Sequence, residues 1–416
     1  MLEMRKMKDS GIEWIGEIPE GWEVSKLKYL GRYVNGYPFK PDDWGDKGKP
    51  IIRIQDLTGS NDSPNYYDGD IDAKYHIKNG DILVSWAATL DAFIWNKGDG
   101  LLNQHIFKAI PQEEKITSYF FFWMIKEAMQ NMNNDNKHGI FMQHVTLDVF
   151  NNFSVPLPPL SEQKRIATYL FQKISEADIM LDDTLSSITG YKKLKQAVIT
   201  QAVTKGVRGE REMKDSGVEW IGEIPKEWKC QKLKYTIFPQ NRPVFSTDEI
   251  ITCFRDGIVT LRKNRREDGF TVSFTEHGYQ GVEIGDLVIH GMDAFAGAIG
   301  CSDSRGKTTP VVHVCTTTGN NRFFMFFLRH MAYSNIFMDF SNGIRIRSSD
   351  FRNFTKLGIF DVLVPPIAEQ NEIADYLDAK CTEIDKLIAK KEQLVKELES
   401  YKKSLIYEVV TGKREV

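Results

Sequence analysis

Cysteine and histidine are scarce in this 416-residue chain, and neither is grouped as a metal site would require. No Cys-x-x-Cys pair occurs and the eight histidines are scattered, which excludes a structural zinc site. The cysteine count is odd and the first half of the chain has none, which argues against a disulfide framework. We therefore expect buried free thiols and a reducing cytoplasm, the thiols being Cys230, Cys253, Cys301, Cys315 and Cys381.

Long apolar runs are also missing. The longest are Tyr119–Ile125 and Phe323–Leu328, and both are far shorter than a membrane-spanning helix. No N-terminal segment combines a basic start, an apolar stretch and a small-residue cleavage site. With 41% apolar and 27% charged residues, the composition is that of an ordinary globular protein.

Neither sign of charge is in large excess. The chain has 54 Lys and Arg against 57 Asp and Glu, a net charge of −3. This balance excludes a histone-like polycation. It leaves room for a nucleic-acid binder, because a local basic patch matters more than the sum.

The chain contains an internal duplication. Met7–Leu30 and Met213–Thr236 are identical at 17 of 24 positions with an offset of 206 residues. Pro158–Leu170 and Pro365–Leu377 are identical at 8 of 13 positions with an offset of 207. Two matches at nearly one offset indicate two copies of one unit, about 7–212 and 213–416, whose middles have diverged. Such repeats suggest one scaffold that presents two different surfaces.

The middle of each copy, about 22–155 and 228–363, has a mixed pattern. Short β-branched runs bounded by Gly, Asn and Asp predict strands. They are Pro50–Ile54, Asp81–Trp86, Gly285–His290 and Pro310–Thr316. Ser118–Asn131 and Arg322–Asn335 predict helices that pack aromatic side chains on these strands. The fold class is therefore predicted as α+β, with two pseudo-symmetric mixed α/β domains.

A long proline-free segment with a heptad pattern follows each Pro-Pro pair. The first apolar seam runs through Ala167, Leu170, Ile174, Ala177, Leu181, Thr184, Ile188, Tyr191, Lys195, Val198 and Ala202. The second, offset by 207, runs through Ala374, Leu377, Cys381, Ile384, Ile388, Lys391, Val395, Leu398, Lys402, Leu405 and Val409. This pattern predicts two long helices that form an antiparallel coiled coil, with Gly190 as a kink or an end of the first. The alternative is two separate amphipathic helices, each packed on its own domain.

The order of these features resembles the specificity subunit of type I restriction–modification systems. The resemblance rests on Leu157-Pro158-Pro159 with Glu162-Gln163 and on Val364-Pro365-Pro366 with Glu369-Gln370. The repeated openings Glu13–Pro19 and Glu219–Pro225 are also similar to this family, and the resemblance covers nearly the whole chain.

The resemblance implies four parts. They are a first target recognition domain (1–157), a central spacer helix (158–212), a second target recognition domain (213–364) and a C-terminal spacer helix (365–416). Each domain would read one half of a bipartite site in double-stranded DNA, while the helices set the spacing. The helices would also hold two DNA methyltransferase subunits, with restriction and translocase subunits added in the full complex. S-adenosylmethionine, ATP and Mg²⁺ would belong to these partners, and this chain would bind no cofactor.

Catalytic motifs are absent from the sequence. An amino-methyltransferase needs an Asn/Asp-Pro-Pro-Tyr/Phe loop, and neither Pro-Pro pair has these neighbours. Gly306-Lys307-Thr308 resembles the end of a phosphate-binding loop, but Cys301 stands where the loop requires glycine. We expect a non-catalytic chain.

The predicted spacer and docking residues are the helix-start motifs and part of the seam. They are Pro158, Pro159, Glu162, Gln163, Leu170, Leu181, Ile188, Pro365, Pro366, Glu369, Gln370, Leu377, Ile388 and Val395.

The predicted DNA contacts are cations, amides and an aromatic residue that suit phosphates and base edges. Segment 229–350 has 15 Lys and Arg against 12 Asp and Glu, whereas segment 22–150 has 14 against 17. The candidates in the first domain are Lys40, Trp44, Arg53, Gln55, Lys97, Gln104, His105, Lys137, His138, Gln143 and His144. Those in the second are Arg242, Arg262, Lys263, Arg265, Arg266, Arg305, Lys307, Arg345, Arg347 and Ser348. The competing interpretation of each is ordinary solvated surface.

One other function stays open. The acidic first domain is also compatible with a coiled-coil adaptor that tethers two partner proteins and binds no DNA.

Overall fold

The computed structural model describes residues 5–60, 63–135, 145–265, 276–339 and 351–416. The chain forms two compact units. Unit 1 consists of Met1–Asp183 with Leu394–Val416, and unit 2 is Thr184–Gln393. Both units therefore contain a part of each long helix, α4 (Leu160–Lys205) and α7 (Ile367–Val410).

Unit 1 is built on a four-stranded antiparallel sheet of order β4-β11-β8-β9. Its strands are β4 (Gly31–Asn35), β8 (Ile82–Ser85), β9 (Asp91–Ile94) and β11 (Ile106–Pro111). A smaller sheet of order β6-β5-β10-β7 comprises β5 (Lys49–Ile52), β6 (Asn65–Tyr67), β7 (His76–Ile77) and β10 (Gly100–Leu102). The short helix α1 (Ile54–Thr58) follows β5.

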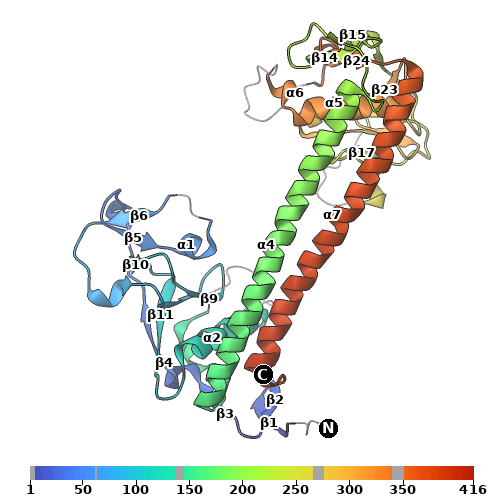
Figure 1. The fold of residues 1–416 in the computed structure, drawn as a ribbon. Coiled ribbons are helices and arrows are strands. Elements are labelled where there is room, and N and C mark those ends of the chain that lie inside the picture. The colour runs from blue at the N-terminus through green and yellow to red at the C-terminus, as the bar shows by residue number, and fades with distance from the viewer. Residues whose placement is uncertain (1–4, 61–62, 136–144, 266–275, 340–350) are drawn as a thin grey trace. The chain divides into compact units, whose positions relative to one another are not determined.

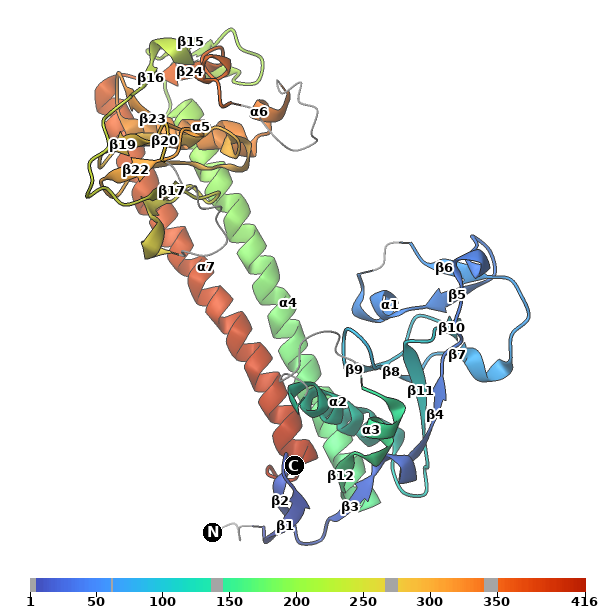
Figure 2. The ribbon, with the colours of Figure 1, turned by 180° about the vertical axis from the view of Figure 1, so that it is seen from behind.

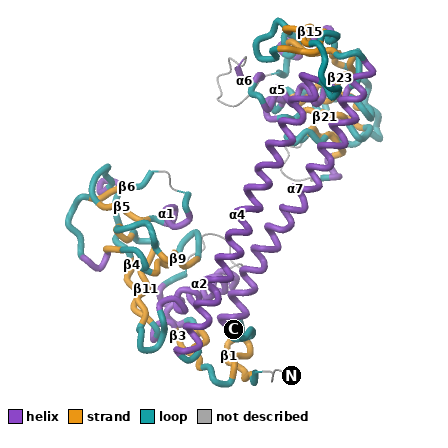
Figure 3. The backbone as a smooth tube through the Cα atoms, in the orientation of Figure 1, coloured by secondary structure: helices purple, strands orange, loops and turns teal. Residues whose placement is uncertain are grey.

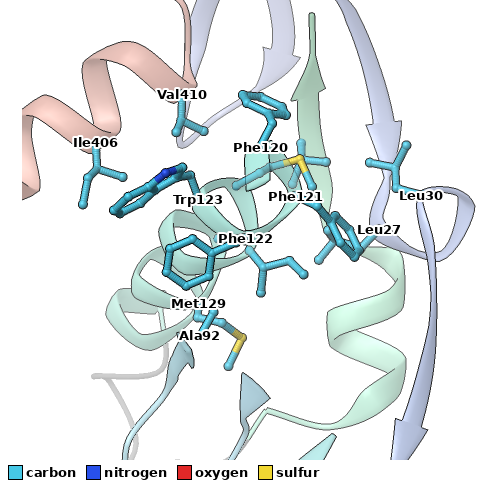
Figure 4. Packing of buried hydrophobic residues seen from close by; sticks show 14 of the residues in the cluster. Leu27, Leu30, Ala92, Phe120, Phe121, Phe122, Trp123, Met129, Ile406 and Val410 are labelled. Carbon is cyan, nitrogen blue, oxygen red and sulfur yellow. The ribbon is translucent and has the colours of Figure 1, made fainter. Parts of the chain in front are cut away.

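Helix α2 (Ser118–Asp135) lies between the larger sheet and the long helices of unit 1 (Figure 2). Its side chains are buried on several faces because it packs on both layers. In Figure 4, Trp123 points toward Ile406 and Val410 of α7, while Phe121 points toward Leu27 and Leu30. The predicted aromatic helix is thus the centre of the unit 1 core.

Unit 2 repeats this plan. Its larger sheet has the order β16-β23-β20-β21, from β16 (Ile237–Pro239), β20 (Leu287–His290), β21 (Ile299–Cys301) and β23 (Val312–Thr317). The aromatic helix α5 (Asn321–Tyr333) corresponds to α2, and α6 (Ile336–Asp339) follows it. Two-stranded pairs take the place of the smaller sheet: β17 (Ile251–Cys253) with β18 (Val259–Leu261), and β19 (Gln280–Val282) with β22 (Gly306–Thr308).

In each domain, the strand that follows the opening hairpin pairs with the domain's last strand. In unit 1, β3 (Glu23–Lys26) pairs with β12 (Ser154–Leu157), which follows α3 (Leu147–Asn152). In unit 2, β15 (Lys229–Lys232) pairs with β24 (Asp361–Val364). A long helix begins a few residues after each last strand, so the pairing fixes where that helix leaves the domain.

The repeated Glu-Trp-Ile-Gly-Glu-Ile-Pro segment forms a hairpin in both units. The hairpins are β1 (Met7–Ile12) with β2 (Gly16–Pro19), and β13 (Met213–Asp215) with β14 (Glu223–Pro225). The unit 1 hairpin holds the end of α7, since Tyr407 Oη donates to Trp14 O at 3.3 Å and Lys413 Nζ to Ile15 O at 2.7 Å. In unit 2, Lys205 at the end of α4 donates to Glu223 O.

The long helices are antiparallel within each unit (Figure 3). In unit 1, the first part of α4 shares a core cluster with the last part of α7, for example Leu170 and Val409. In unit 2, the last part of α4 shares a cluster with the first part of α7, for example Val203 and Leu377. All seam positions are buried or half-buried. The predicted α+β fold with an antiparallel helix pair is therefore confirmed.

Two lysines on the seam have aspartate partners at equivalent positions. Lys195 lies 2.6 Å from Asp385 in unit 2, and Lys402 pairs with Asp178 in unit 1. Lys195 and Lys402 are 207 residues apart in the sequence, as are Asp178 and Asp385. These two charged positions of the apolar seam are therefore each paired with a carboxylate on the facing helix. Of the two outcomes predicted at Gly190, the helix end is wrong, because α4 continues through this residue without a break.

All five cysteines are free. Burial raises the pKa of Cys253 and of Cys301 to about 12, which leaves both as unreactive thiols.

Candidate nucleic-acid interface

Three of the predicted cations lie close together in unit 2, in and beside β22 and directly after β18. Figure 1 labels β17, which pairs with β18, and Figure 2 labels β22. The backbone connects their segments, since Lys307 N–H donates to Glu249 O at 2.9 Å and Arg262 N–H to Ile250 O at 2.8 Å. Lys263 and Arg305 flank these contacts. We call Lys263, Arg305, Lys307 and their carboxylate partners the paired-cation patch.

Each cation of the patch is held by carboxylates. Lys263 Nζ lies 2.6 Å from Glu249, and Lys307 Nζ lies 2.7 Å from Glu276. Arg305 contacts both Asp248, at 3.3 Å, and Glu283. These pairs join residues that are 14, 31, 57 and 22 positions apart in the sequence. The tertiary fold therefore creates them, and local spacing does not.

An exposed aromatic ring supports Arg305. Its guanidinium lies 4.5 Å from the centre of the Phe245 ring, and Phe245 is 52% exposed. An arginine stacked on an aromatic ring is suited to recognise phosphates and guanine edges, and in this structure Nε and Nη1 of Arg305 are bound by Asp248 and Glu283. Phe245 and the four carboxylates escaped the sequence prediction. Phe245, Asp248 and Glu249 follow Arg242 within seven residues, whereas Glu276 and Glu283 lie 31 and 22 positions from the cations they contact, and no local pattern points to them.

Arg242 and Arg265 are also paired, outside the patch. Arg242 makes a bidentate ion pair with Asp286, in which Nη2 donates to Oδ1 at 3.1 Å. Arg265 contacts Asp256 and stacks 4.5 Å from the Phe254 ring. Burial acts to raise the pKa of Asp256, but the bonds from Arg265 and from Ile258 N–H outweigh it and the pKa lies below its usual value.

A cavity of about 860 Å³ lies beside Arg262 and Arg265. Its lining also includes Arg255, which contacts Asp293 at 2.8 Å, and His290. Burial lowers the pKa of His290, so its ring is neutral at neutral pH. The cavity thus combines arginines, the Asp256 and Asp293 carboxylates that pair with two of them, and a neutral imidazole, a set of donors and acceptors that suits polar or base-edge ligands.

Four first-domain candidates gather around α1. The guanidinium of Arg53 lies 5.6 Å from the ring centre of Trp44, which is 43% exposed. Lys97 Nζ donates to Asp56 O at 2.7 Å, and Gln55 is exposed on the same short helix. This is a second arginine stacked on an exposed aromatic ring, as in unit 2.

The other first-domain candidates lie elsewhere. Gln104 Nε2 and His105 Nε2 are 3.3 Å apart on an exposed turn, and Lys40 is exposed just before the 3-10 turn Pro41–Asp43. The remaining predicted contacts lie outside the described residues. They are Lys137, His138, Gln143, His144, Arg266, Arg345, Arg347 and Ser348.

The helix-start motifs are internal anchors. Trp22 Nε1 donates to Glu162 at 2.9 Å, and Arg5 lies 2.6 Å from the same carboxylate. In unit 2, Trp228 Nε1 donates to Glu369 at 3.0 Å. Arg211 lies 2.6 Å from Glu369, whose side chain is 1% exposed. Each carboxylate therefore fastens the first turn of a long helix to a buried tryptophan and an arginine.

The glutamines of the motif act in the same way. Gln163 accepts from Thr117 N–H at 2.8 Å and donates to Pro158 O at 2.9 Å. Gln370 accepts from Asn320 N–H at 2.9 Å and donates to Pro365 O at 2.8 Å. Both glutamines are buried, which gives the motif a structural role inside its own unit.

The predicted docking residues on the helices point mostly inward. Leu170, Ile188, Leu377 and Ile388 are buried, Leu181 and Val395 are half-buried, Pro158 and Pro365 are buried, and Pro159 and Pro366 are exposed. The exposed apolar side chains of the helices lie off the seam and were missed. They include Ile179 and Met180 in unit 1, and Leu185, Leu194 and Leu387 in unit 2.

Metal-ligand clusters and membrane-spanning helices are both absent from the described ranges. No three His, Cys, Asp or Glu side chains come together there as metal ligands. Within those ranges, no helix has the length and apolar character needed to cross a membrane.

Comparison with known proteins identifies similar chains. Residues 19–188 match the model of the type I restriction modification DNA specificity domain. The chain is 26% identical over 271 residues to the type I restriction enzyme EcoBI specificity subunit of Escherichia coli, covering 64% of this chain and 57% of that one. It is 28% identical over 430 residues to the type I restriction enzyme MjaX specificity subunit of Methanocaldococcus jannaschii, covering 96% and 95%.

A solved structure has the same fold. It comes from work on complex assembly and conformational transition of the type I R-M system, and it covers 95% of this chain and 99% of its own. The TM-score is 0.66 at 15% identity.

Proposed function

Because this chain belongs to the type I restriction–modification specificity subunits, we propose that it reads a bipartite site in double-stranded DNA. Each domain reads one half of the site. The observation that carries this proposal is the pair of domains with one strand order and different surfaces. Stacked arginines occur in both, at Arg53 and at Arg305, but their surroundings differ.

The long helices serve two purposes in this proposal. They set the number of base pairs between the two half-sites, and they dock two DNA methyltransferase subunits. The exposed apolar residues off the seam, such as Ile179 and Leu185, supply surface for such contacts. Restriction and translocase subunits join in the full complex.

Catalysis belongs to the partners. S-adenosylmethionine is bound by the methyltransferase subunits, and ATP and Mg²⁺ by the restriction and translocase subunits, while this chain supplies recognition. The complex acts in the cytoplasm, where the host DNA is. The adaptor hypothesis without DNA is not favoured, because family membership ties the chain to DNA specificity.

Methylation mapping of the host genome tests this function. The host is sequenced with the chain present, with it deleted and with it restored. We expect one bipartite adenine-methylation motif to disappear on deletion and to return on restoration. A motif that persists without the chain, or the absence of any motif that depends on it, would rule the function out.

A further inference from the structure

The paired-cation patch has no net positive charge. It combines three cations, Lys263, Arg305 and Lys307, with four carboxylates, Asp248, Glu249, Glu276 and Glu283. Phosphate attraction depends on unneutralised Lys and Arg charge. Off DNA, this surface therefore attracts a duplex only weakly, although it carries side chains suited to contact one.

The four carboxylates differ in exposure. Asp248 is 3% exposed at its side chain, and its oxygen accepts from Phe245 N–H at 2.8 Å. It is fixed, and it positions Arg305 over the Phe245 ring. Glu249, Glu276 and Glu283 are 52%, 51% and 43% exposed, so they can rotate into solvent and release their cations. Lys263 and Arg305 are themselves 49% and 39% exposed, whereas Lys307 is 13% exposed. Exposed pairs such as those of Lys263 and Arg305 contribute little to stability, and exchanging one partner for another costs little.

We propose that Glu249, Glu276 and Glu283 are exchangeable counter-charges that determine the specificity of the second domain. They hold Lys263, Lys307 and Arg305 while the domain is on the wrong sequence. They release these cations only at the correct half-site, where phosphates and base edges are placed to bind them. This proposal rests on the DNA-reading function proposed above.

The physical effect is a penalty on binding to arbitrary DNA. At any sequence, three carboxylates compete with phosphate for the cations and also repel it. At the correct half-site, additional base contacts offset this competition. Affinity for random DNA therefore falls more than affinity for the cognate site, and the ratio between the two rises.

Charge-removing substitutions of similar shape test the proposal. The triple variant E249Q/E276Q/E283Q is compared with the wild type and with E212Q. Glu212 provides a matched control because it makes an exposed pair with Lys226, at 2.7 Å, away from the patch. Each full-length chain is purified from its host together with its methyltransferase subunits. Binding is measured by fluorescence anisotropy, over a range of KCl concentrations, on a cognate duplex and on a scrambled duplex.

We expect the triple variant to bind the scrambled duplex about tenfold more tightly than the wild type. Each cation that newly meets a phosphate steepens the slope of log affinity against log salt by about 0.9. The cognate duplex should gain less, so that the specificity ratio falls. E212Q should behave as the wild type, and thermal melting of all variants should agree.

Two results would overturn the proposal. One is a triple variant with unchanged or weaker affinity for scrambled DNA, in a complex whose wild type still prefers its cognate site. In that case the DNA-reading function stands and the counter-charge role fails. The other is a wild-type complex that binds neither duplex, which removes the DNA-reading function as well.

Discussion

Removal of the Glu369 carboxylate should release the start of α7 from unit 2. The substitution Glu369→Ala leaves Trp228 Nε1 without its acceptor and Arg211 without its carboxylate partner, although Arg211 Nη2 still donates to Lys205 O at 2.9 Å. The setting is buried, since the side chains of Arg211 and Glu369 are 15% and 1% exposed. Loss of one member of a buried ion pair costs about 3–5 kcal/mol. The equivalent change in unit 1 is Glu162→Ala. Its cost should be about 1–3 kcal/mol, because the side chains of Arg5 and Glu162 are 27% and 13% exposed.

Hydrogen–deuterium exchange followed by mass spectrometry measures amide protection in the two units separately. In Glu369→Ala, amides in the first turns of α7 should exchange roughly a hundredfold to several thousandfold faster, while the start of α4 keeps its protection. In Glu162→Ala the effect should be smaller and confined to the start of α4. Equal losses in the two variants, or no loss in Glu369→Ala, would refute the anchoring role.

Three further changes have expected outcomes. Burial lowers the pKa of His330 to about 4, so the neutral ring stabilises unit 2 above pH 6.5 and roughly 3 kcal/mol is lost as pH falls from 6.5 to 4. Urea titrations of His330→Gln should show a shallower loss of stability over this pH range, because only the contribution of His330 is removed, and an unchanged slope would contradict the assignment. Lys195→Met should stabilise the helix pair by about 1 kcal/mol and loosen its register, as thermal melting and sedimentation would show. A destabilised Lys195→Met variant would contradict the claim that this lysine lowers the stability of the helix pair and fixes its register. Gly412→Ala brings Cβ within 2.5 Å of Pro19, whereas Gly11→Ala meets nothing within 4 Å at a similar positive φ. Only the former should speed amide exchange in the opening hairpin, and equal effects would show that backbone strain alone matters.

Periodic features were the most predictable from the sequence. The heptad seam located both long helices because side chains on one helix face recur every three or four residues whatever the tertiary context. The duplication predicted equal domains, and the structure has the same strand order in both larger sheets. Gly190 misled because an exposed glycine inside a long helix costs only about 1 kcal/mol, which the surrounding turns absorb.

The hydrogen-bond and ion-pair partners of the polar residues could not be predicted from the sequence. Glu162 and Glu369 were recognised as residues of a helix first turn, but the tryptophans that they bind lie about 140 residues earlier in the chain. The candidate cations of the second domain were chosen from the Lys and Arg residues of the sequence. Their carboxylate partners depend on how β17, β19 and β22 come together in the fold. Ion pairs of this kind follow from tertiary structure, which local sequence patterns do not encode.

A domain exchange tests the central claim most directly. Residues 213–364 are replaced by the corresponding segment of a relative with a different sequence there, and adenine methylation is mapped across the host genome. One half of the methylated motif should change, while the other half and the number of bases between them stay the same. A motif in which both halves change, or neither does, would contradict the claim that each domain reads its own half-site.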